Sequence, residues 1–417
     1  MPTCCPDQSQ TPGRTALEPT QVLRLPWRGS AVIRLCKSQK TKASETSRRD
    51  LHLLGLGLSI AGSPAGRSAQ ASSRSRLAVQ QAASANMTNI LIASGKGAPE
   101  LELLKQLPSG VNIVAIGNQS EEFSDLTEEQ WKSIDAVLKC GIGPHTSSKA
   151  LLQELWPKMP NLKWIHSCTA GVEALLWPEL IESDVAVTNA RGAFSHSLAE
   201  WAITACSWFA KDLPRMRRNQ KAHSWESYEV EELRNKTLGI VGYGDIGRAT
   251  ASIGRAFRMK VVALRRRVQL SDDERKDGLQ VIPADHLNDL MSTSDYIVAA
   301  LPHTDGTDKL ISQSAIQAMK KTGVFINVGR GGTVDEPALI EALQKGSIRG
   351  AGLDVFATEP LPEESPLWDL DNVLLSPHTA DRTTTFQFEA IEQWLQQVQK
   401  FVNKQYLANV VDKTQGY

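Results

Sequence analysis

The segment LGIVGYGDIGRA limits the fold of this chain more than any other part of its sequence. It places Gly242, Gly244 and Gly247 directly after an apolar run and at the start of a stretch with helical spacing. The first glycine permits a tight turn, the second lets a pyrophosphate approach the backbone, and the third allows close packing of helix on strand. Phosphates then meet the unpaired N–H groups at the helix start. The segment predicts a dinucleotide-binding βαβ unit, with a plain glycine turn as the alternative.

Short apolar runs alternate with stretches of helical spacing from Met87 onward. The first series of runs is NILIAS, VNIVAIG, DAVLKC and LKWIHSC, and the second is TLGIVGYG, KVVALR, DYIVAAL, GVFINVG, RGAGLDV and NVLLSPH. This alternation predicts an α/β fold with parallel sheets flanked by helices. A helical segment at about 195–223 separates the two series, and FEAIEQWLQQVQKFV closes the chain. Asp335 and Gly346 are expected to begin and end the helix after GVFINVG.

Composition is that of a soluble globular enzyme or binding protein. Hydrophobic residues make up 41%, charged residues 22%, and the formal net charge is zero. These values argue against a nucleic-acid partner, and no apolar run reaches the roughly 18 residues of a membrane span. The six cysteines show neither metal-ligand spacing nor a disulfide framework. We therefore expect no metal.

The first 86 residues read as a targeting leader outside the fold, expected to be disordered. They hold 12 Lys and Arg against 4 Asp and Glu, which leaves 34 basic and 42 acidic residues after them. Arg48 and Arg49 precede an apolar run and an Ala-x-Ala at 69–71, the order of an export signal. With the basic, serine-containing region ahead of it, the leader resembles a two-part plastid signal and predicts delivery to a plastid, with the stroma favoured over the lumen. The alternatives are a simple transit peptide with a chance arginine pair, or a true start at Met87 and a cytoplasmic protein.

Three consecutive arginines follow the second strand of the dinucleotide unit. Arg265 lies 18 residues beyond Gly247, where an NAD site carries an acid for the ribose hydroxyls. A guanidinium attracts a 2′-phosphate and can bind it with two hydrogen bonds. The sequence predicts NADP(H) as the preferred cofactor, bound by Arg265 and Arg266, with Arg267 in a solvated turn. The alternative is NAD(H) with an exposed basic turn.

Four polar residues follow predicted strands in the second half, namely Arg330, Asp354, Glu359 and His378. In an open parallel sheet, ligands bind beyond the carboxyl ends of the strands. Arg330 suits a substrate carboxylate and keto oxygen, and His378 suits proton transfer. Glu359 can orient the imidazole. Together they predict a general acid/base site beside the dinucleotide.

The segments NVGRGGTVDEPALIEAL, AGLDVFATEPLPEESPLW and SPHTA resemble the D-isomer-specific 2-hydroxyacid dehydrogenase family. The resemblance covers everything after the leader. It implies two Rossmann-like domains, a substrate domain at 87–190 and 380–417 and an inserted cofactor domain at 191–379. It also implies a homodimer formed through the helical segment at about 195–223.

The resemblance implies roles for particular residues as well. The catalytic trio is Arg330, Glu359 and His378. The cofactor-binding residues are Gly242, Gly244, Asp245, Ile246, Gly247, Arg265, Arg266, Leu301, Pro302, Val328, Gly329, Arg330, Asp354, His378 and Ala380. The substrate-binding residues are Thr169, Ala170, Gly171, Val172 and Arg330. Two departures from the family pattern are Arg258 and Asp381, where many members carry Gly.

The leading hypothesis is NADPH-preferring reduction of a small 2-keto acid, of the glyoxylate or hydroxypyruvate type. One alternative is an NAD-dependent dehydrogenase that works in the oxidative direction. The other is a nucleotide-sensing co-repressor scaffold of the same fold, which the leader and the acidic charge after Met87 disfavour.

Overall fold

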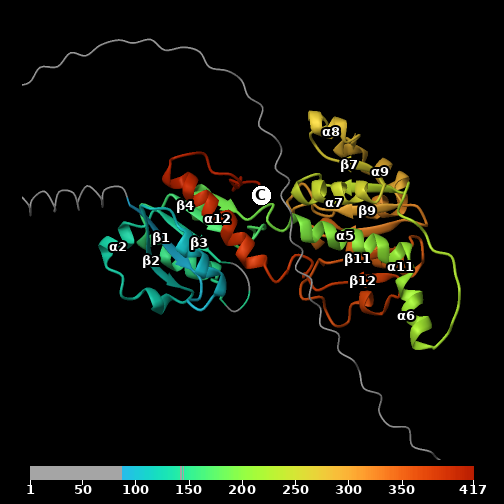
Figure 1. Cartoon of the computed structure of the whole chain (residues 1–417), viewed down its shortest axis with the longest axis horizontal. Helices are drawn as coiled ribbons and strands as arrows, with labels where there is room; N and C mark the ends of the chain where they lie inside the picture. The colour runs from blue at the N-terminus through green and yellow to red at the C-terminus, as the bar shows by residue number, and fades with distance from the viewer. Residues whose placement is uncertain (1–86, 141–142, 144) are drawn as a thin grey trace, which may run out of the picture. The chain divides into compact units, whose positions relative to one another are not determined.

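Two parallel sheets, each covered by helices on both faces, form the part of the chain that the structure describes (Figure 1). This computed structural model describes residues 87–140, 143 and 145–417, so the leader prediction lies outside the described residues. The first sheet has the order β2-β1-β3-β4-β5 and the second the order β12-β11-β10-β9-β6-β7-β8. The strands are β1 Thr88–Ala93, β2 Val111–Gly117, β3 Ala136–Lys139, β4 Trp164–Ser167, β5 Ala186–Asn189, β6 Thr237–Val241, β7 Lys260–Leu264, β8 Gln280–Ile282, β9 Tyr296–Ala299, β10 Val324–Asn327, β11 Gly350–Leu353 and β12 Val373–Leu375.

Helices connect the parallel strands, as crossover connections require. The α-helices are α2 Glu128–Lys132, α3 Lys149–Leu155, α4 Pro178–Glu182, α5 Ser195–Ala210, α6 Leu213–Lys221, α7 Asp245–Ala256, α8 Asp272–Lys276, α9 Leu287–Thr293, α10 Gln313–Ala318, α11 Glu336–Gln344 and α12 Phe386–Val402. The 3₁₀ helices are η1 Pro99–Gln106, η2 Ser120–Phe123, η3 Trp156–Lys158, η4 Ala284–His286, η5 Gly331–Thr333 and η6 Pro366–Asp369.

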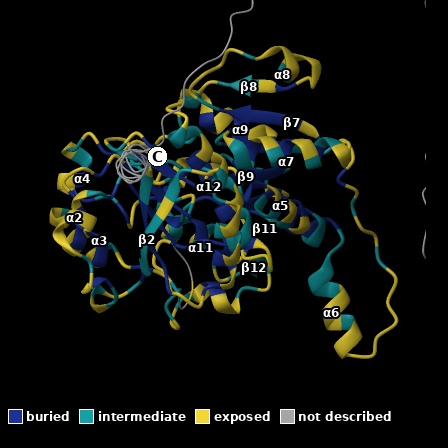
Figure 2. Cartoon of the chain, turned by 60° about the vertical axis from the view of Figure 1, so that its left-hand side comes forward, coloured by how far each residue is buried: buried dark blue, intermediate teal, exposed yellow. Residues whose placement is uncertain are grey.

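The central strands β9 and β10 of the second sheet are buried at every position, because their side chains are packed against helices on both faces. Ile297 and Phe325 face α9, α10 and α11, whereas Val298 and Ile326 face α5 and α7. Figure 2 shows these strands buried beneath their helices. This arrangement leaves the strand ends and the loops after them as the places where polar side chains can gather.

The first sheet is covered by α2, α3 and α4 on one face and by η1 and α12 on the other. Trp394 of α12 is fully buried in the same cluster as Trp164 of β4, whose ring centroid lies 5.0 Å from that of Phe401 of α12. The end of the chain also returns to this sheet, where the Val411 N–H donates to the Val187 carbonyl at 2.8 Å. The closing helix therefore belongs to the core of the first sheet, although it follows the second sheet in sequence.

The predicted strands are confirmed, and so is the helix after GVFINVG. Asp335 accepts a hydrogen bond from the Ala338 N–H at the start of α11, and Gly346 follows its end with φ 62°. The helical segment at 195–223 is two helices instead of one, because Asp212 has φ 49° and caps α6, with Pro214 in its first turn. The segment PELELLKQ, Pro99–Gln106, has helical spacing in the sequence and forms a 3₁₀ helix.

Within the described residues, none of the helices has both the length and the apolar character needed to cross a bilayer. The same residues contain no group of three or more His, Cys, Asp or Glu side chains arranged to hold a metal ion.

Candidate active site

The glycine loop joins β6 to α7 as a dinucleotide site requires. Gly242 has φ 98°, and a Cβ there would lie 2.7 Å from the Ala300 carbonyl oxygen, so no other residue fits without strain. Gly244 precedes α7, a helix of 12 residues, and no side chain caps the first N–H groups. Uncapped N–H groups and the positive end of the helix dipole are suited to a pyrophosphate.

Asp245 and Ile246 form the first turn of α7, as predicted. The Asp245 carboxylate pairs with Arg191 at 3.2 Å and with Arg248 at 2.7 Å. Leu301 and Pro302 follow β9, and a Cβ on Gly329 would lie 2.6 Å from the Leu301 carbonyl oxygen. The predicted loops after β6, β9 and β10 therefore meet at one edge of the second sheet.

Arg265 stands at the end of β7, but its guanidinium is paired with a carboxylate. Its Nη1 and Nη2 lie 2.7 Å and 2.9 Å from the two oxygens of Glu274, and Nη2 also donates to the Gln269 carbonyl. The Arg265 guanidinium holds the pKa of Glu274 at about 2, well below the ordinary 4.5. Only 14% of the Arg265 side chain is exposed. Sequence reasoning did not find Glu274.

The other two arginines are exposed. Arg266 donates a hydrogen bond to the Tyr417 hydroxyl and lies over its ring, 5.8 Å from the centroid. For Arg267 the described residues include no hydrogen-bond or ion-pair partner, which fits the solvated turn.

His378 and Glu359 form a close pair after β12 and β11. The His378 Nδ1 lies 2.7 Å from Glu359 Oε2, and the Phe356 N–H donates to Glu359 Oε1 at 3.0 Å. His378 has φ 51°, and its N–H donates to the Asp354 carbonyl at 2.9 Å. His378 is therefore held at its backbone N–H and at its imidazole Nδ1, while 40% of its side chain is exposed. Its Nε2 is thus left to meet a substrate.

Asp354 is fully buried behind His378 and holds the turn that carries it. One oxygen, Oδ1, accepts from the Ser376 hydroxyl at 2.6 Å and from the N–H groups of Thr379 and Ala380 at 2.9 Å and 3.1 Å. The other, Oδ2, is buried with no partner among the described residues. A buried carboxylate oxygen needs a donor, and the amide of a nicotinamide ring can supply one. The site therefore fits a nicotinamide dinucleotide.

Asp381 follows this turn at the position of the second departure from the family pattern. Burial raises the pKa of its carboxyl above the ordinary range, although the nearby His378 acts in the opposite direction.

The loop at 169–172, here called the substrate loop, follows β4 of the first sheet, whereas Arg330 follows β10 of the second sheet, and the two are in contact. A Cβ on Gly171 would overlap the Arg330 guanidinium, so the loop backbone lies against it. Arg330 Nε also pairs with Glu173 at 3.2 Å, a contact that the sequence did not reveal. The N–H groups of Ala170, Gly171 and Val172 have no acceptor among the described residues. A cation beside three free N–H groups is suited to a carboxylate ligand.

The loop itself is held rigidly by short polar contacts. Thr169 Oγ1 donates to the Gly171 carbonyl at 2.7 Å and contacts Ser167 Oγ at 2.8 Å. Asn189 donates to the Ala170 carbonyl at 2.5 Å. These contacts hold the backbone of the loop in place beside Arg330.

A dinucleotide loop, a carboxylate-binding loop and a histidine–carboxylate pair define a nicotinamide-dependent oxidoreductase of hydroxy or keto acids. Residues 203–380 match the family model described as D-isomer specific 2-hydroxyacid dehydrogenase, NAD binding domain. The chain belongs to the D-isomer-specific 2-hydroxyacid dehydrogenase family, whose members depend on NAD or NADP.

Similar proteins include reductases and a dehydrogenase. A glyoxylate/hydroxypyruvate reductase B of Enterobacter sp. (strain 638) is 35% identical over 57% of this chain and 74% of its own length. D-3-phosphoglycerate dehydrogenase of Methanocaldococcus jannaschii is 30% identical over 78% of this chain, which spans only 60% of that relative. The solved NADPH-dependent glyoxylate/hydroxypyruvate reductase of Sinorhizobium meliloti, in complex with NADP and sulfate, is 26% identical, with a TM-score of 0.66 over 79% of this chain and 100% of that one.

Proposed function

We propose that this protein reduces a small 2-keto acid, of the glyoxylate or hydroxypyruvate type, to the 2-hydroxy acid with NADPH. The observation that carries the proposal is the His378–Glu359 pair at 2.7 Å, together with an arginine that lies against a loop of free N–H groups. The reductase names of two of the similar proteins support the substrate class.

Arg330 and the loop at 169–172 bind the substrate carboxylate in this proposal. The existing Arg330–Glu173 contact is half-exposed, with 33% and 45% of the two side chains accessible. Such a pair contributes no more than about 1 kcal/mol. A substrate carboxylate can therefore take the place of Glu173 at the guanidinium.

His378 supplies the proton. Its Nδ1–H donates to the Glu359 carboxylate, which favours the imidazolium form, and in that form Nε2 carries the second proton, which passes to the keto oxygen and leaves a neutral imidazole. Arg330 stabilises the negative charge that develops on that oxygen. The bound nicotinamide supplies the hydride that C2 of the substrate accepts. The cofactor would be held by the glycine loop, by the residues after β9 and β10, and by Asp354 Oδ2.

NADPH is proposed over NADH because of charge. Arg265, Arg266 and Arg267 carry three positive charges at the end of β7, and Glu274 neutralises one of them. Of the other two, Arg267 lies in the solvated turn, and the exposed Arg266 favours a 2′-phosphate. The Glu274 pairing is also the specific observation that favours the alternative, an NAD-dependent enzyme that works in the oxidative direction, since it occupies Arg265.

A steady-state assay tests both the proposed substrate class and the proposed preference for NADPH. We expect turnover of glyoxylate or hydroxypyruvate, with a higher kcat/KM for NADPH than for NADH. Arg266→Ala should lower that ratio, and Arg234→Ala, at an exposed arginine just before β6, is the matched control. A preference for NADH would leave the alternative standing. No turnover of glyoxylate, hydroxypyruvate, pyruvate or phenylpyruvate would favour the scaffold instead.

We also propose a homodimer and delivery to a plastid. The dimer proposal rests on α5 and α6: α6 contributes no buried residue, and Met216 is 41% exposed (Figure 2). Light scattering in solution tests it, and a monomer at micromolar concentration would contradict it. Imaging of the full chain carrying a C-terminal fluorescent protein tests the plastid proposal against the cytoplasmic alternative.

A further inference from the structure

The Lys139 side chain is largely buried and has no counter-ion among the residues that the structure describes. Lys139 is the last residue of β3, and only 8% of it is exposed. Its ammonium group makes no hydrogen bond or ion pair with any residue that the structure describes. Burial lowers the pKa of its ammonium group. A mostly buried lysine whose ammonium has no partner gains free energy from an anion that reaches it, because a charge-assisted hydrogen bond is stronger in such surroundings than in water.

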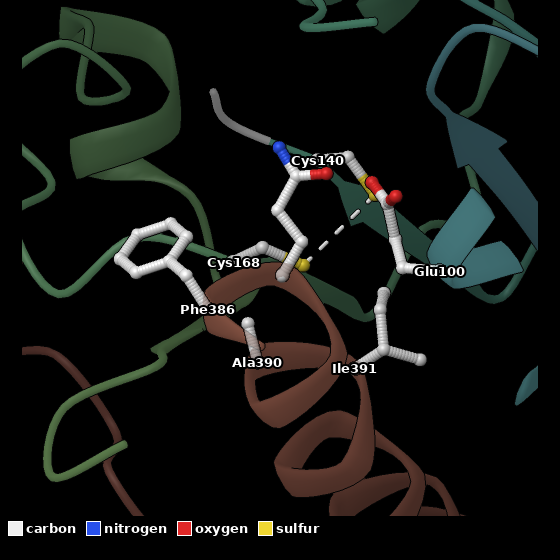
Figure 3. A pocket seen from close by; sticks show the side chains of 7 residues that line it. Glu100, Cys140, Cys168, Phe386, Ala390 and Ile391 are labelled. Carbon is white, nitrogen blue, oxygen red and sulfur yellow. Dashed lines mark hydrogen bonds between the residues drawn. The ribbon is translucent and has the colours of Figure 1, made fainter. Parts of the chain in front are cut away.

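The side chain of Lys139 lies on the face of the first sheet that carries the substrate loop. Successive strand residues point to opposite faces. Val137, two residues earlier, packs in the same cluster as Val172 of that loop. Cys140 points the other way, toward α12, where its Sγ lies 4.0 Å from that of Cys168 (Figure 3). The cavity there is about 10 Å³, room for a single water molecule and not for a substrate.

The strand register places Lys139 at the base of the substrate loop. Lys139 pairs with Ser167 across β3 and β4, so their side chains lie on the same face. Ser167 Oγ contacts Thr169 Oγ1 at 2.8 Å, and the loop then runs to Gly171 against Arg330. Arg330 thus lies at one end of this loop and Lys139 at the other, with the free N–H groups between them.

We propose that Lys139 binds a second carboxylate on the substrate, so that the preferred substrates are 2-keto acids with a carboxylate beyond C3. This inference rests on the proposed function and narrows its substrate class. The first carboxylate and the keto oxygen are bound by Arg330, the loop and His378. The group on C3 then extends along the loop toward the unpaired ammonium.

The reaction is unchanged by this assignment. C2 accepts the hydride, the keto oxygen accepts the proton of His378, and the second carboxylate takes no part in bond changes. A charge-assisted hydrogen bond to a buried lysine is expected to contribute about tenfold to a hundredfold in kcat/KM.

The test compares two substrates of similar shape, fresh oxaloacetate and 4-methyl-2-oxopentanoate, with NADPH. In the wild type we expect kcat/KM to be at least about tenfold higher for oxaloacetate. Lys139→Met keeps the apolar stem without the charge and should reduce that ratio about tenfold or more. Glyoxylate has no C3, so the fall in kcat/KM that Lys139→Met causes should be smaller for glyoxylate than for oxaloacetate. An unchanged ratio in Lys139→Met would overturn the proposal.

A binding measurement on the wild type keeps the test independent of the variant's folding. In the presence of NADP, D-malate should raise the Tm at an at least tenfold lower concentration than D-2-hydroxy-4-methylpentanoate does, and equal concentrations would contradict the inference. If the wild type reduces glyoxylate without preferring the diacid, only this inference fails. If it reduces no 2-keto acid at all, the proposed function fails.

Discussion

His378 is held in a backbone conformation that most residues avoid. Its φ of 51° and the hydrogen bond of its N–H to the Asp354 carbonyl direct the imidazole toward Glu359. A non-glycine residue with positive φ persists where its surroundings fix it, and such residues concentrate at functional sites. Here the Asp354 carbonyl holds the backbone N–H of His378, and the Glu359 carboxylate holds its Nδ1.

His378→Ala is therefore expected to lower kcat by about 10²- to 10⁴-fold, the usual effect of removing an acid/base catalyst. The measurement is steady-state turnover of glyoxylate with NADPH. The matched control is His286→Ala, because His286 also pairs with a carboxylate, Asp289, at 2.8 Å but lies in η4. The control should keep wild-type turnover. Wild-type kcat in the His378 variant would remove this histidine from the mechanism.

Residue identities predicted the trio but not its partners. Arg330, Glu359 and His378 follow strands in recognisable segments, so their place at the sheet edge could be read from sequence. Glu173 and Glu274 could not, because their contacts with Arg330 and Arg265 depend on how loops fold back. Lys139 ends a predicted strand, but no sequence pattern indicates that its side chain is largely buried.

At the scale of elements, the β6–α7 unit separates a glycine needed for folding from one needed for binding. A Cβ on Gly247 would overlap the Gly242 carbonyl oxygen, whereas a Cβ on Gly244 meets nothing within 4 Å. Gly247 allows α7 to approach β6, and Gly244 leaves space in front of the helix.

The two alanine variants should therefore behave differently. Gly247→Ala should lower the Tm, because backbone must move to accept the methyl group. Gly244→Ala should leave the Tm unchanged and raise the Kd for NADPH at least tenfold, because the methyl group occupies the space of the pyrophosphate. Calorimetry and fluorescence titration measure these quantities. Unaltered NADPH affinity in Gly244→Ala would mean that the dinucleotide does not approach this loop.

The contact between β7 and α8 depends on pH through Glu274. Its pKa is lowered from 4.5 to about 2 by Arg265, so the carboxylate stabilises the fold above pH 4.5 and loses this effect as the pH falls toward 2. Urea unfolding should therefore give a higher free energy of unfolding for the wild type than for Glu274→Gln at pH 7, and this difference should shrink as the pH falls from 4.5 toward 2. A difference independent of pH would contradict the pairing.

Elements with long apolar runs were predictable, whereas short or interrupted ones were not. β9 and β10 are buried at every position and stand out in sequence. β5 and β8 were missed, because β5 ends in Thr188 and Asn189 and β8 has only three residues. The break between α5 and α6 follows from Asp212 and Pro214, a capping signal that the long helical pattern obscured.

At the scale of the whole chain, the closing segment completes the first sheet. Val411 is 5% exposed within the cluster that covers β4 and β5, and the Lys413 ammonium donates to the carbonyls of Leu180 and Val185 at 2.9 Å and 3.2 Å. The sheet therefore needs contacts from residues more than 200 positions away. The return of α12 to this sheet could be predicted from the family resemblance alone, because neither hydrophobic periodicity nor composition indicates which distant parts of a chain are in contact.

The two ends of the chain are therefore expected to matter differently. All four clusters of buried apolar side chains lie between Ile90 and Val411. A chain that starts at Met87 should keep the wild-type Tm and kcat/KM, because every described core residue is retained. A chain that ends at residue 403 should lose several degrees of Tm, because removing Val411 and Lys413 exposes the edge of β5 and leaves the carbonyls after α4 without their donor. Thermal unfolding and glyoxylate turnover of the two truncations, measured against the full chain, decide this. If the chain from Met87 were inactive or unstable while the other truncation behaved as the wild type, the first 86 residues would be part of the working fold and the expected targeting leader would be wrong.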